Sequence, residues 1–447
     1  MINLHLKKGF SPRLAGAPAQ TRHDLPALRH VGVTPYRIPF IKPRLLVSEG
    51  DSVAIGSPLF EDKRDTRIRF HAPGGGKVSR IQFGPRRIIQ EIVIDLDDDE
   101  EAISFDIPEG RRPAELPREE LIDLLLTGGI WPFLRCFPYM DLASPDMIPP
   151  SIMVRLGDDD PFTPDPRVYL EGQQTYFLLG IEALSCLCPN VVINTIVDDA
   201  LPSPLPDTVK VQRFNGHFPA GNPGVQLYHT KTGPELNRSW FIDGQDVALL
   251  GEFWTTRRYP IGRIMSVGGS LAPAAGHVAS RAGVPLGLLS GSAHGSVPEA
   301  RYIVGGIFSG YTGSADSFMG FYQNALNLID EGDREEPFGF IRPGFGKPSY
   351  SRAFLSSLHR RSFPMDCCQH GEVRACVNCG TCTKICPVDI LPQFTMKCLV
   401  ADEVEEALAH GLLDCAECGL CTYVCPSKIE LREIFRAAKA QYYKETT

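Results

Sequence analysis

The spacing of apolar residues in the second quarter of the chain switches repeatedly between a helical and a strand period. Runs with helical spacing cover residues 118–126 and 171–187, whereas compact apolar runs typical of buried strands cover residues 152–156 and 191–197. Strands that alternate with helices favour a parallel sheet covered by those helices. The pattern therefore predicts a Rossmann-like α/β domain with a partly parallel sheet over residues 111–257.

The N-terminal part of the chain has shorter apolar runs that alternate with glycine turns, as in segments 47–53, 56–60 and 68–78. This arrangement resembles the flattened β-sandwich of biotinyl and lipoyl domains, in which a lysine occupies an exposed hairpin tip. Lys63 lies near the equivalent bend, but its neighbours match a modification site poorly. We therefore interpret residues 1–110 as an N-terminal region with a biotinyl/lipoyl-like barrel-sandwich that serves for packing.

Two further parts follow the α/β region. Short strands and glycine turns at residues 263–269, 284–289 and 301–311 predict a small β-grasp domain of the SLBB-like kind over residues 258–335. A linker rich in proline and glycine then leads into an α-helical domain, together covering residues 336–447. Apolar residues recur there at helical spacing, namely Leu399, Val400, Val404, Ala407, Leu408, Leu412, Leu431, Ile434, Phe435 and Ala438. The predicted fold class is multidomain α/β.

Composition places the chain among globular proteins and excludes several classes of function. Of its 447 residues 43% are hydrophobic and 22% are charged, and its formal net charge is -8. This acidic balance argues against a nucleic-acid partner, which favours a basic face. No apolar run approaches the roughly 18 to 20 residues of a membrane-spanning helix, and the first residues lack the features of an export signal. We expect a cytoplasmic chain, in which structural disulfides are disfavoured.

Eight of the fourteen cysteines form two copies of one motif. The copies read Cys376-x2-Cys379-x2-Cys382-x3-Cys386-Pro387 and Cys415-x2-Cys418-x2-Cys421-x3-Cys425-Pro426. Three thiolates spaced three residues apart wrap three corners of a cubane, and in two-cluster ferredoxins the fourth cysteine of each run ligates the other cluster. This rule predicts two 4Fe-4S clusters. Their ligands are Cys376, Cys379, Cys382 and Cys425 for the first, and Cys415, Cys418, Cys421 and Cys386 for the second.

Zinc is the alternative metal, because paired CxxC units also form four-cysteine zinc sites. A zinc site of that kind leaves the third and fourth cysteine of each run without a function, which favours iron and sulfide. The remaining cysteines are interpreted as buried free thiols: Cys136, Cys186, Cys188, Cys367, Cys368 and Cys398. The Cys367-Cys368-Gln369-His370 segment is a weaker metal candidate, because two adjacent side chains do not readily close on one ion.

A nucleotide ligand for the α/β domain would need a glycine-rich turn at a helix N-terminus. The chain contains no GxGxxG motif, and the nearest candidate is Gly128-Gly129-Ile130-Trp131-Pro132. Bulky residues directly after its two glycines leave little room for the backbone to approach a phosphate. The segment is therefore a poor phosphate-binding loop.

Several segments in the same order carry a resemblance to a known family: residues 6–9, 15–18, 60–63, 218–224, 243–247, 389–392 and 421–426. Together they resemble NqrA, the peripheral subunit of the sodium-translocating NADH:quinone reductases, within the superfamily of RnfC and the complex I flavoprotein. The resemblance implies an oxidoreductase component on the inner face of the cell membrane, partnered by integral-membrane and flavin-bearing subunits. It also implies contact with quinone, for which Trp131, Phe133 and Phe137 are candidate apolar walls, although such aromatic residues more often belong to a core.

The chain differs from the families that it resembles in its cysteines and in two segments that correspond to loops of RnfC. It keeps all eight cluster cysteines, as RnfC does, whereas NqrA subunits look like proteins from which most of these cysteines have been lost. The loop resembling GxGGAGFPT, which holds FMN and NADH in RnfC and the flavoprotein, reads Gly-Gly-Ile-Trp-Pro-Phe at residues 128–133. The YPxGGE turn of RnfC is replaced by Phe-Pro-Ala-Gly-Asn-Pro-Gly at residues 218–224. We therefore expect neither FMN nor NADH on this chain.

These observations favour a subunit of a sodium-pumping NADH:quinone reductase that carries electrons through two 4Fe-4S clusters toward quinone. One alternative is an RnfC-like component, through which electrons enter an ion-translocating ferredoxin:NAD oxidoreductase; it predicts NADH oxidation by this chain. A second alternative is a structural scaffold whose clusters only hold the helical domain together. No acid-base pair or nucleophile in the sequence indicates a separate catalytic activity.

Overall fold

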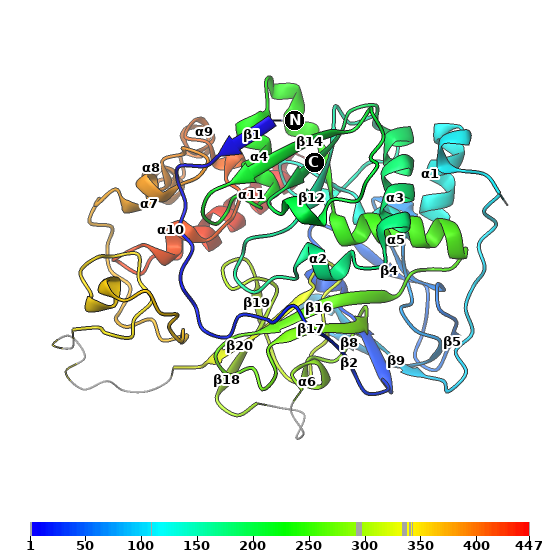
Figure 1. The fold of residues 1–447 in the computed structure, drawn as a ribbon, viewed down its shortest axis with the longest axis horizontal. Helices are drawn as coiled ribbons and strands as arrows, with labels where there is room; N and C mark the ends of the chain where they lie inside the picture. The colour runs from blue at the N-terminus through cyan, green and yellow to red at the C-terminus, as the bar shows by residue number, and fades with distance from the viewer. Residues whose placement is uncertain are drawn as a thin grey trace.

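The computed structural model describes residues 2–108, 110–291, 297–332, 338, 341 and 343–446. Four sheets and a C-terminal group of helices pack into one body (Figure 1). The barrel-sandwich lies at one end of this body, and the helices α7 to α10 lie at the opposite end, with the largest sheet between them. The prediction of a multidomain α/β protein is confirmed at this level.

The largest sheet has a parallel centre, as the alternating pattern predicts. Five neighbouring strands run parallel and two antiparallel strands close one edge. In spatial order the strands are β1 (Ile2–His5), β14 (Lys210–Asn215), β13 (Val191–Thr195), β12 (Ile152–Leu156), β15 (Trp240–Asp243), β10 (Arg135–Cys136) and β11 (Asp141–Leu142). The helices of this part are α1 (Arg118–Thr127), α2 (Pro166–Tyr169), α3 (Gln174–Leu187), α4 (Pro223–Thr230) and α5 (Gly244–Thr256). The central strands are continuous apolar runs because both of their faces are buried.

A six-stranded mixed sheet follows in the chain. Its strands, in spatial order, are β19 (Tyr311–Gly313), β18 (Ala300–Val304), β20 (Ala325–Asp330), β16 (Gly262–Gly268), β17 (Gly276–Arg281) and β2 (Arg22–Asp24). The predicted strand at residues 284–289 is wrong, because this run forms the short helix α6 (Leu286–Leu289). Leu286 and Leu289 are both buried at helical spacing. An apolar run this short does not reveal its period in the sequence.

Two small sheets form the N-terminal barrel-sandwich. One contains β3 (His30–Val33), β9 (Ile89–Leu96), β8 (Gly76–Phe83) and β5 (Ser52–Val53), and the other contains β4 (Pro43–Leu45), β6 (Pro58–Asp62) and β7 (Asp65–His71). Lys63 and Arg64 are the two residues between β6 and β7, so Lys63 does lie at a hairpin tip. The Arg64 guanidinium connects this tip to two other parts of the chain. It donates to the Asp141 carboxylate in β11, at 2.6 and 2.9 Å, and to the Tyr443 hydroxyl in the C-terminal helix, at 2.6 Å.

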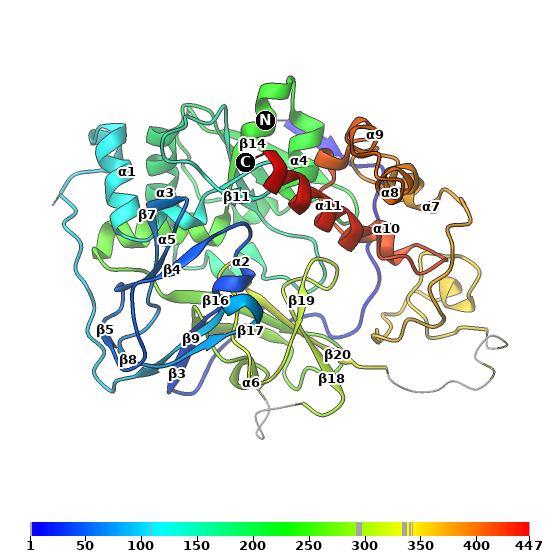
Figure 2. The same cartoon turned by 180° about the vertical axis from the view of Figure 1, so that it is seen from behind.

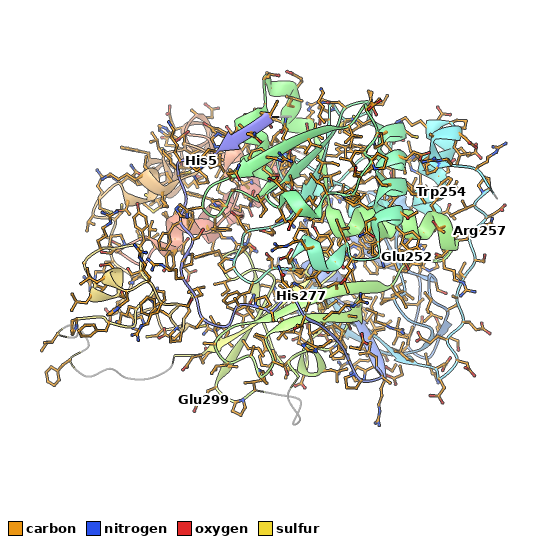
Figure 3. The ribbon with its side chains drawn as sticks, viewed as in Figure 1. His5, Glu252, Trp254, Arg257, His277 and Glu299 are labelled. Carbon is orange, nitrogen blue, oxygen red and sulfur yellow. The ribbon has the colours of Figure 1, made fainter. Side chains whose placement is uncertain are left out.

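Two short strands among the first 24 residues pair with strands that come much later in the chain. Strand β1 pairs in parallel with β14, and β2 pairs in parallel with β17. His277 on β17, labelled in Figure 3, is buried, and its Nδ1 lies 2.7 Å from the Ala19 carbonyl oxygen while its Nε2 lies 2.9 Å from the Asp165 backbone nitrogen. The predicted domain of residues 1–110 therefore contains segments that the structure distributes over three parts of the molecule.

The C-terminal part is helical, as predicted. It consists of α7 (Thr381–Ile385), α8 (Pro392–Val400), α9 (Val404–Ala409), α10 (Leu420–Tyr423) and α11 (Leu431–Thr446). Figure 2 shows α11 in red, running from beside α10 across the large sheet toward the C-terminus. The predicted boundary between residues 335 and 336 and part of the predicted linker lie outside the described residues. Among the described helices, none is both long enough and apolar enough to cross a membrane.

The Arg64 contacts give a test of how the barrel-sandwich docks. Replacing Arg64 with alanine removes charged hydrogen bonds, which stabilise a fold by about 1.5 to 3 kcal/mol each when they are partly buried. We expect Arg64→Ala to lower the midpoint of denaturant unfolding clearly. Arg67→Ala is the matched control, because Arg67 is nearly half exposed and its outer partner Asp146 is mostly exposed; exposed ion pairs contribute about 0 to 1 kcal/mol. Equal effects of the two substitutions would contradict the docking role.

Candidate metal centre

The two cysteine runs fold in the same way. In each, the residue before the second cysteine, Asn378 or Glu417, has a positive φ, and so does the glycine after it, Gly380 or Gly419. These turns lead into the short helices α7 and α10, which place the third cysteine in their first turn. The space beside Gly419 is also closed, because a Cβ there would lie 2.9 Å from the Phe308 carbonyl oxygen. Glycine is therefore required both for the turn and for the approach of this loop.

Backbone contacts bring the start of the first run to the end of the second. The Arg374 nitrogen donates to the Ser427 carbonyl oxygen at 2.9 Å, and the Ser427 hydroxyl donates to the Ala375 carbonyl oxygen at 3.0 Å. Cys376 directly follows Ala375, and Cys425 lies two residues before Ser427. The structure thus places these two cysteines on adjoining segments.

The other crossed set converges on one pocket. Cys386 from the first run lines it together with Cys415, Cys418 and Cys421 from the second, and the space between its atoms is about 380 Å³. Cys386 and Cys418 are buried, and the other two are partly exposed. Four cysteines from two distant segments of the chain therefore line one space, and they are the four residues of the predicted second ligand set.

Burial raises the pKa of all four thiols that line this pocket, and the negative charge of neighbouring cysteines raises it further at three of them. Burial raises the pKa of Cys415 to about 11 and also raises the pKa of Cys386, Cys418 and Cys421 above the ordinary range. Negative charge on Cys386 adds to this rise at each of the three partners. Four thiolates can share so small a buried space only if positive charge accompanies them.

Two cations on α11 supply part of that positive charge. The Lys439 ammonium is almost fully buried; it donates to the Cys415 carbonyl oxygen at 3.1 Å and pairs with the Glu417 carboxylate at 2.8 Å. The Arg432 guanidinium lines the same pocket and donates to the Glu417 carbonyl oxygen at 2.9 Å. Sequence reasoning missed both residues. Their signal was a spacing of seven residues, which places them on one face of the helix beside the apolar positions of α11.

Two aspartates hold the loops that press against the second run. Asp159 accepts hydrogen bonds from the backbone nitrogens of residues 220 and 221, and the next residue, Asn222, donates to the Ala416 carbonyl oxygen at 3.2 Å. Asp160 accepts from the backbone nitrogens of residues 308 and 309, and the carbonyl oxygen of residue 309 accepts from Arg432 at 2.7 Å. Burial, followed by repulsion from Asp158, raises the pKa of both aspartates to about 7.

The first predicted ligand set is more open than the second. Cys379 is exposed, and hydrogen bonding to Thr381 lowers the pKa of its thiol. Lys397 on α8 donates to the Asn378 side chain beside it at 3.4 Å. The two predicted centres therefore differ in their contact with solvent.

The weaker metal candidate near residue 370 does not assemble. His370 pairs with Asp366 at 3.2 Å, while its backbone nitrogen donates to the Cys368 sulfur at 3.4 Å. Among the described residues, no group of three histidine, cysteine or acidic side chains has the spacing of a site for a single metal ion.

A second pocket adjoins the second cysteine run. It lies between the loop after β10, helix α4 and residues 413–416, and it is open to solvent on one side. Phe137, Met140 and Leu227 form apolar walls, Lys231 and Asn237 add polar groups, and Cys415 reaches the same space. Of the three aromatic residues proposed for quinone contact, only Phe137 lines this pocket. Trp131 and Phe133 are fully buried in the hydrophobic core.

The glycine pair that resembles a flavin loop is covered by side chains of the protein itself. A Cβ at Gly128 would lie 2.1 Å from the Phe253 ring, and one at Gly129 would lie 2.5 Å from the His71 ring. His71 is buried, and this burial lowers the pKa of its imidazole to about 3. Gly128 thus serves packing inside the α/β domain, and Gly129 serves packing of that domain against the barrel-sandwich.

Comparisons with known proteins agree with this division of the chain. Residues 4–97 match the NqrA N-terminal barrel-sandwich hybrid domain, residues 116–259 match the NqrA second alpha/beta domain, and residues 375–429 match a 4Fe-4S dicluster domain. The NqrA subunit of the Na(+)-translocating NADH-quinone reductase of Rhodopirellula baltica is 33% identical over 92% of this chain and 91% of its own length. Its counterpart of the same name from Saccharophagus degradans is 31% identical over 92% of each chain.

One solved structure, of an NAD+-reducing NiFe-hydrogenase in the air-oxidized state, aligns with 49% of this chain and 50% of its own, at a TM-score of 0.32 and 11% identity. The predictions of a barrel-sandwich, an α/β domain and an iron-sulfur region are confirmed by the family matches.

The raised pKa of Asp159 gives a test of the loop support. Because its pKa rises from 3.8 to about 7 on folding, its contribution to stability is complete below pH 3.8 and is lost as the pH rises to about 7. Asp159→Asn cannot ionise, so its stability relative to the unchanged protein should improve with pH up to about 7, by at most about 1.4 kcal/mol per pH unit. Urea unfolding between pH 5 and 8 measures this difference. Asp207→Asn, at an exposed position, is the control. A stability difference between Asp159→Asn and the unchanged protein that stays the same at every pH would contradict the prediction.

Proposed function

Because the chain belongs to the NqrA family of Na+-translocating NADH-quinone reductase subunits, we propose that it carries electrons through two 4Fe-4S clusters toward quinone in such a reductase. The observation that carries this proposal is the crossed arrangement of eight cysteines, with four sulfur atoms around one pocket. When bound, an iron-sulfur cluster supplies one-electron transfer at a potential set by charge, hydrogen bonds and exposure.

The residues present fit two clusters. Cys376, Cys379, Cys382 and Cys425 would hold the first, and Cys415, Cys418, Cys421 and Cys386 would hold the second. Thiolates are the soft ligands that iron-sulfur clusters require. The cations of α11 offset the negative charge of the second set, and the loops held by Asp159 and Asp160 contact the second cysteine run through Asn222 and Arg432. Each crossed cysteine also fastens the two runs to each other.

We further propose that the pocket beside Cys415 receives the quinone ring. Its walls are mostly apolar, as expected for a small-molecule site, and it carries a few polar groups that can orient carbonyl oxygens. Lys231 is held by Asp414 at 2.5 Å and by Asn237 at 3.2 Å, so its ammonium has a fixed position at the pocket wall. Direct contact of Cys415 with this space supports electron exchange over a short distance.

The proposal also covers the surroundings of the chain. Partners would be integral-membrane and flavin-bearing subunits of the same reductase, with this chain peripheral on the cytoplasmic face and FMN and NADH bound elsewhere. The packing of Phe253 and His71 against Gly128 and Gly129 supports the last point. An RnfC-like function remains the alternative because all eight cluster cysteines are retained; bound FMN and NADH oxidation by the purified chain would favour it.

We propose the finer domain assignments on the same basis: a barrel-sandwich in residues 1–110, a Rossmann-like domain in 111–257, a β-grasp domain of the SLBB-like kind in 258–335, and a linker with a helical ferredoxin domain in 336–447. The neighbour order β17-β16-β20-β18, with α6 between β17 and β18 in the chain, supports the β-grasp assignment.

Metal content tests the cluster proposal. The full chain, assembled anaerobically with iron and sulfide, should contain about eight irons and eight sulfides, as two 4Fe-4S clusters require. Cys418→Ser should lose about half of the iron, because the second set loses a buried ligand. Cys398→Ser is the control and should keep the full content, since Cys398 lies outside both sets. A zinc-containing or iron-free chain would overturn the proposal. If Cys418→Ala unfolds the C-terminal domain while the complex still assembles with unchanged electron flux, the scaffold alternative is favoured.

Ligand binding tests the quinone proposal separately. Met140→Trp should weaken binding of a short-chain ubiquinone at least tenfold, because the larger ring fills the pocket beside Cys415. Ile148→Trp, at an exposed position outside the pocket, is the control and should bind as the unchanged chain does. Calorimetry on the iron-loaded chain measures both. Unchanged affinity of Met140→Trp would place the quinone elsewhere while leaving the cluster proposal intact.

A further inference from the structure

A buried ion pair lies beside the second ligand set, and the binding of a cluster by the four cysteines does not explain its presence. Lys439 is 3% exposed, and a lysine buried to this extent is rare unless it is paired. Its partner Glu417 lies between two cluster cysteines in sequence, and its other contact is the carbonyl oxygen of Cys415. Glu417 lines the pocket together with Arg432 and with cysteine, proline, aliphatic and aromatic side chains, whereas Lys439 lies behind this wall.

Electrostatics gives this ion pair a specific consequence. Adding an electron to a 4Fe-4S cluster with four thiolate ligands increases a charge that is already negative, and burial alone disfavours that increase. A cation nearby favours it, and the effect is larger in a buried site than in water. The Lys439 ammonium is in place for this effect, because it lies 3.1 Å from the Cys415 carbonyl oxygen, next to a ligand of the second set.

We propose that Lys439 is a positioning residue that sets the reduction potential of the second cluster, making it easier to reduce, and that Glu417 partly offsets this effect. The inference rests on the proposed function, because it requires a cluster held by Cys386, Cys415, Cys418 and Cys421. No bond breaks and no proton moves; one electron from an external reductant is added to the cluster. Arg432 lines the pocket and Lys439 contacts the Cys415 carbonyl oxygen, so two cations of α11 lie beside the second site.

The first ligand set has no equivalent buried cation among its described contacts. The cations beside it, Lys384 and Lys397, stand next to the exposed Cys379, where water screens their charge. Substituting a lysine on α11 should therefore act on one centre and leave the other nearly unchanged. This selectivity separates an electrostatic effect from a general loss of structure.

A redox titration followed by electron paramagnetic resonance tests the proposal, using the full chain assembled anaerobically and dithionite as reductant. Lys439→Met should make the second cluster at least tenfold harder to reduce, a shift of about 59 mV for a one-electron couple. Glu417→Gln should shift the same signal in the opposite direction. Lys444→Met, which removes an exposed charge from the same helix, should leave it in place. A ligand substitution, Cys379→Ser, identifies which signal belongs to the second cluster.

Opposite signs for the two substitutions are the expected result, and a purely structural role for the ion pair would not produce them. Potentials that are unchanged, or that move in the same direction in both variants, would overturn the inference. If Lys439→Met does not fold, Glu417→Gln decides alone: a higher potential supports the proposal and an equal or lower one overturns it. The iron content of each protein separates the two claims. A chain without iron would contradict the proposed function, whereas a chain with the full iron content and unchanged reduction potentials would contradict only this inference.

Discussion

The C-terminal part of the structure depends on one constraint, which is the confinement of four cysteine sulfurs in a buried pocket. Burial and mutual repulsion raise the pKa values of these thiols, so the same side chains resist becoming thiolates unless positive charge joins them. The metal ions of the proposed cluster would supply most of that charge, and Lys439 and Arg432 of α11 supply a fixed part of it. The crossed position of Cys386 means that neither run can form this pocket alone.

The remaining domains contribute to the same pocket from a distance. The α/β sheet and the six-stranded sheet each send one loop toward the second cysteine run, and adjacent aspartates after β12 hold both loops. Helix α11 links the pocket to the barrel-sandwich, since Lys439 lies beside Cys415 and Tyr443 contacts Arg64 at the hairpin tip. The N-terminal residues add a further tie, because Lys8 pairs with Asp389 just after the first run. A change in any domain can therefore reach the metal centre.

Features with local signals were predictable from the sequence. The cysteine spacing indicated the iron-sulfur region, and the helical and strand periods indicated the α/β domain, because both depend on residues close together in the chain. The pairing of β1 with β14 was not predictable, since a short strand does not reveal a partner about 200 residues away. Lys439 and Asp160 were missed for the same reason: an isolated charge shows its importance only when distant segments surround it.

The most direct test of the account is the location of iron in the folded chain. Anomalous diffraction at the iron edge, from crystals grown without oxygen, should show two separate iron clusters, with Cys386 bound to the one that Cys415, Cys418 and Cys421 also hold. Cys386 bound to the same metal as Cys376, or scattering at the zinc edge in place of iron, would contradict it.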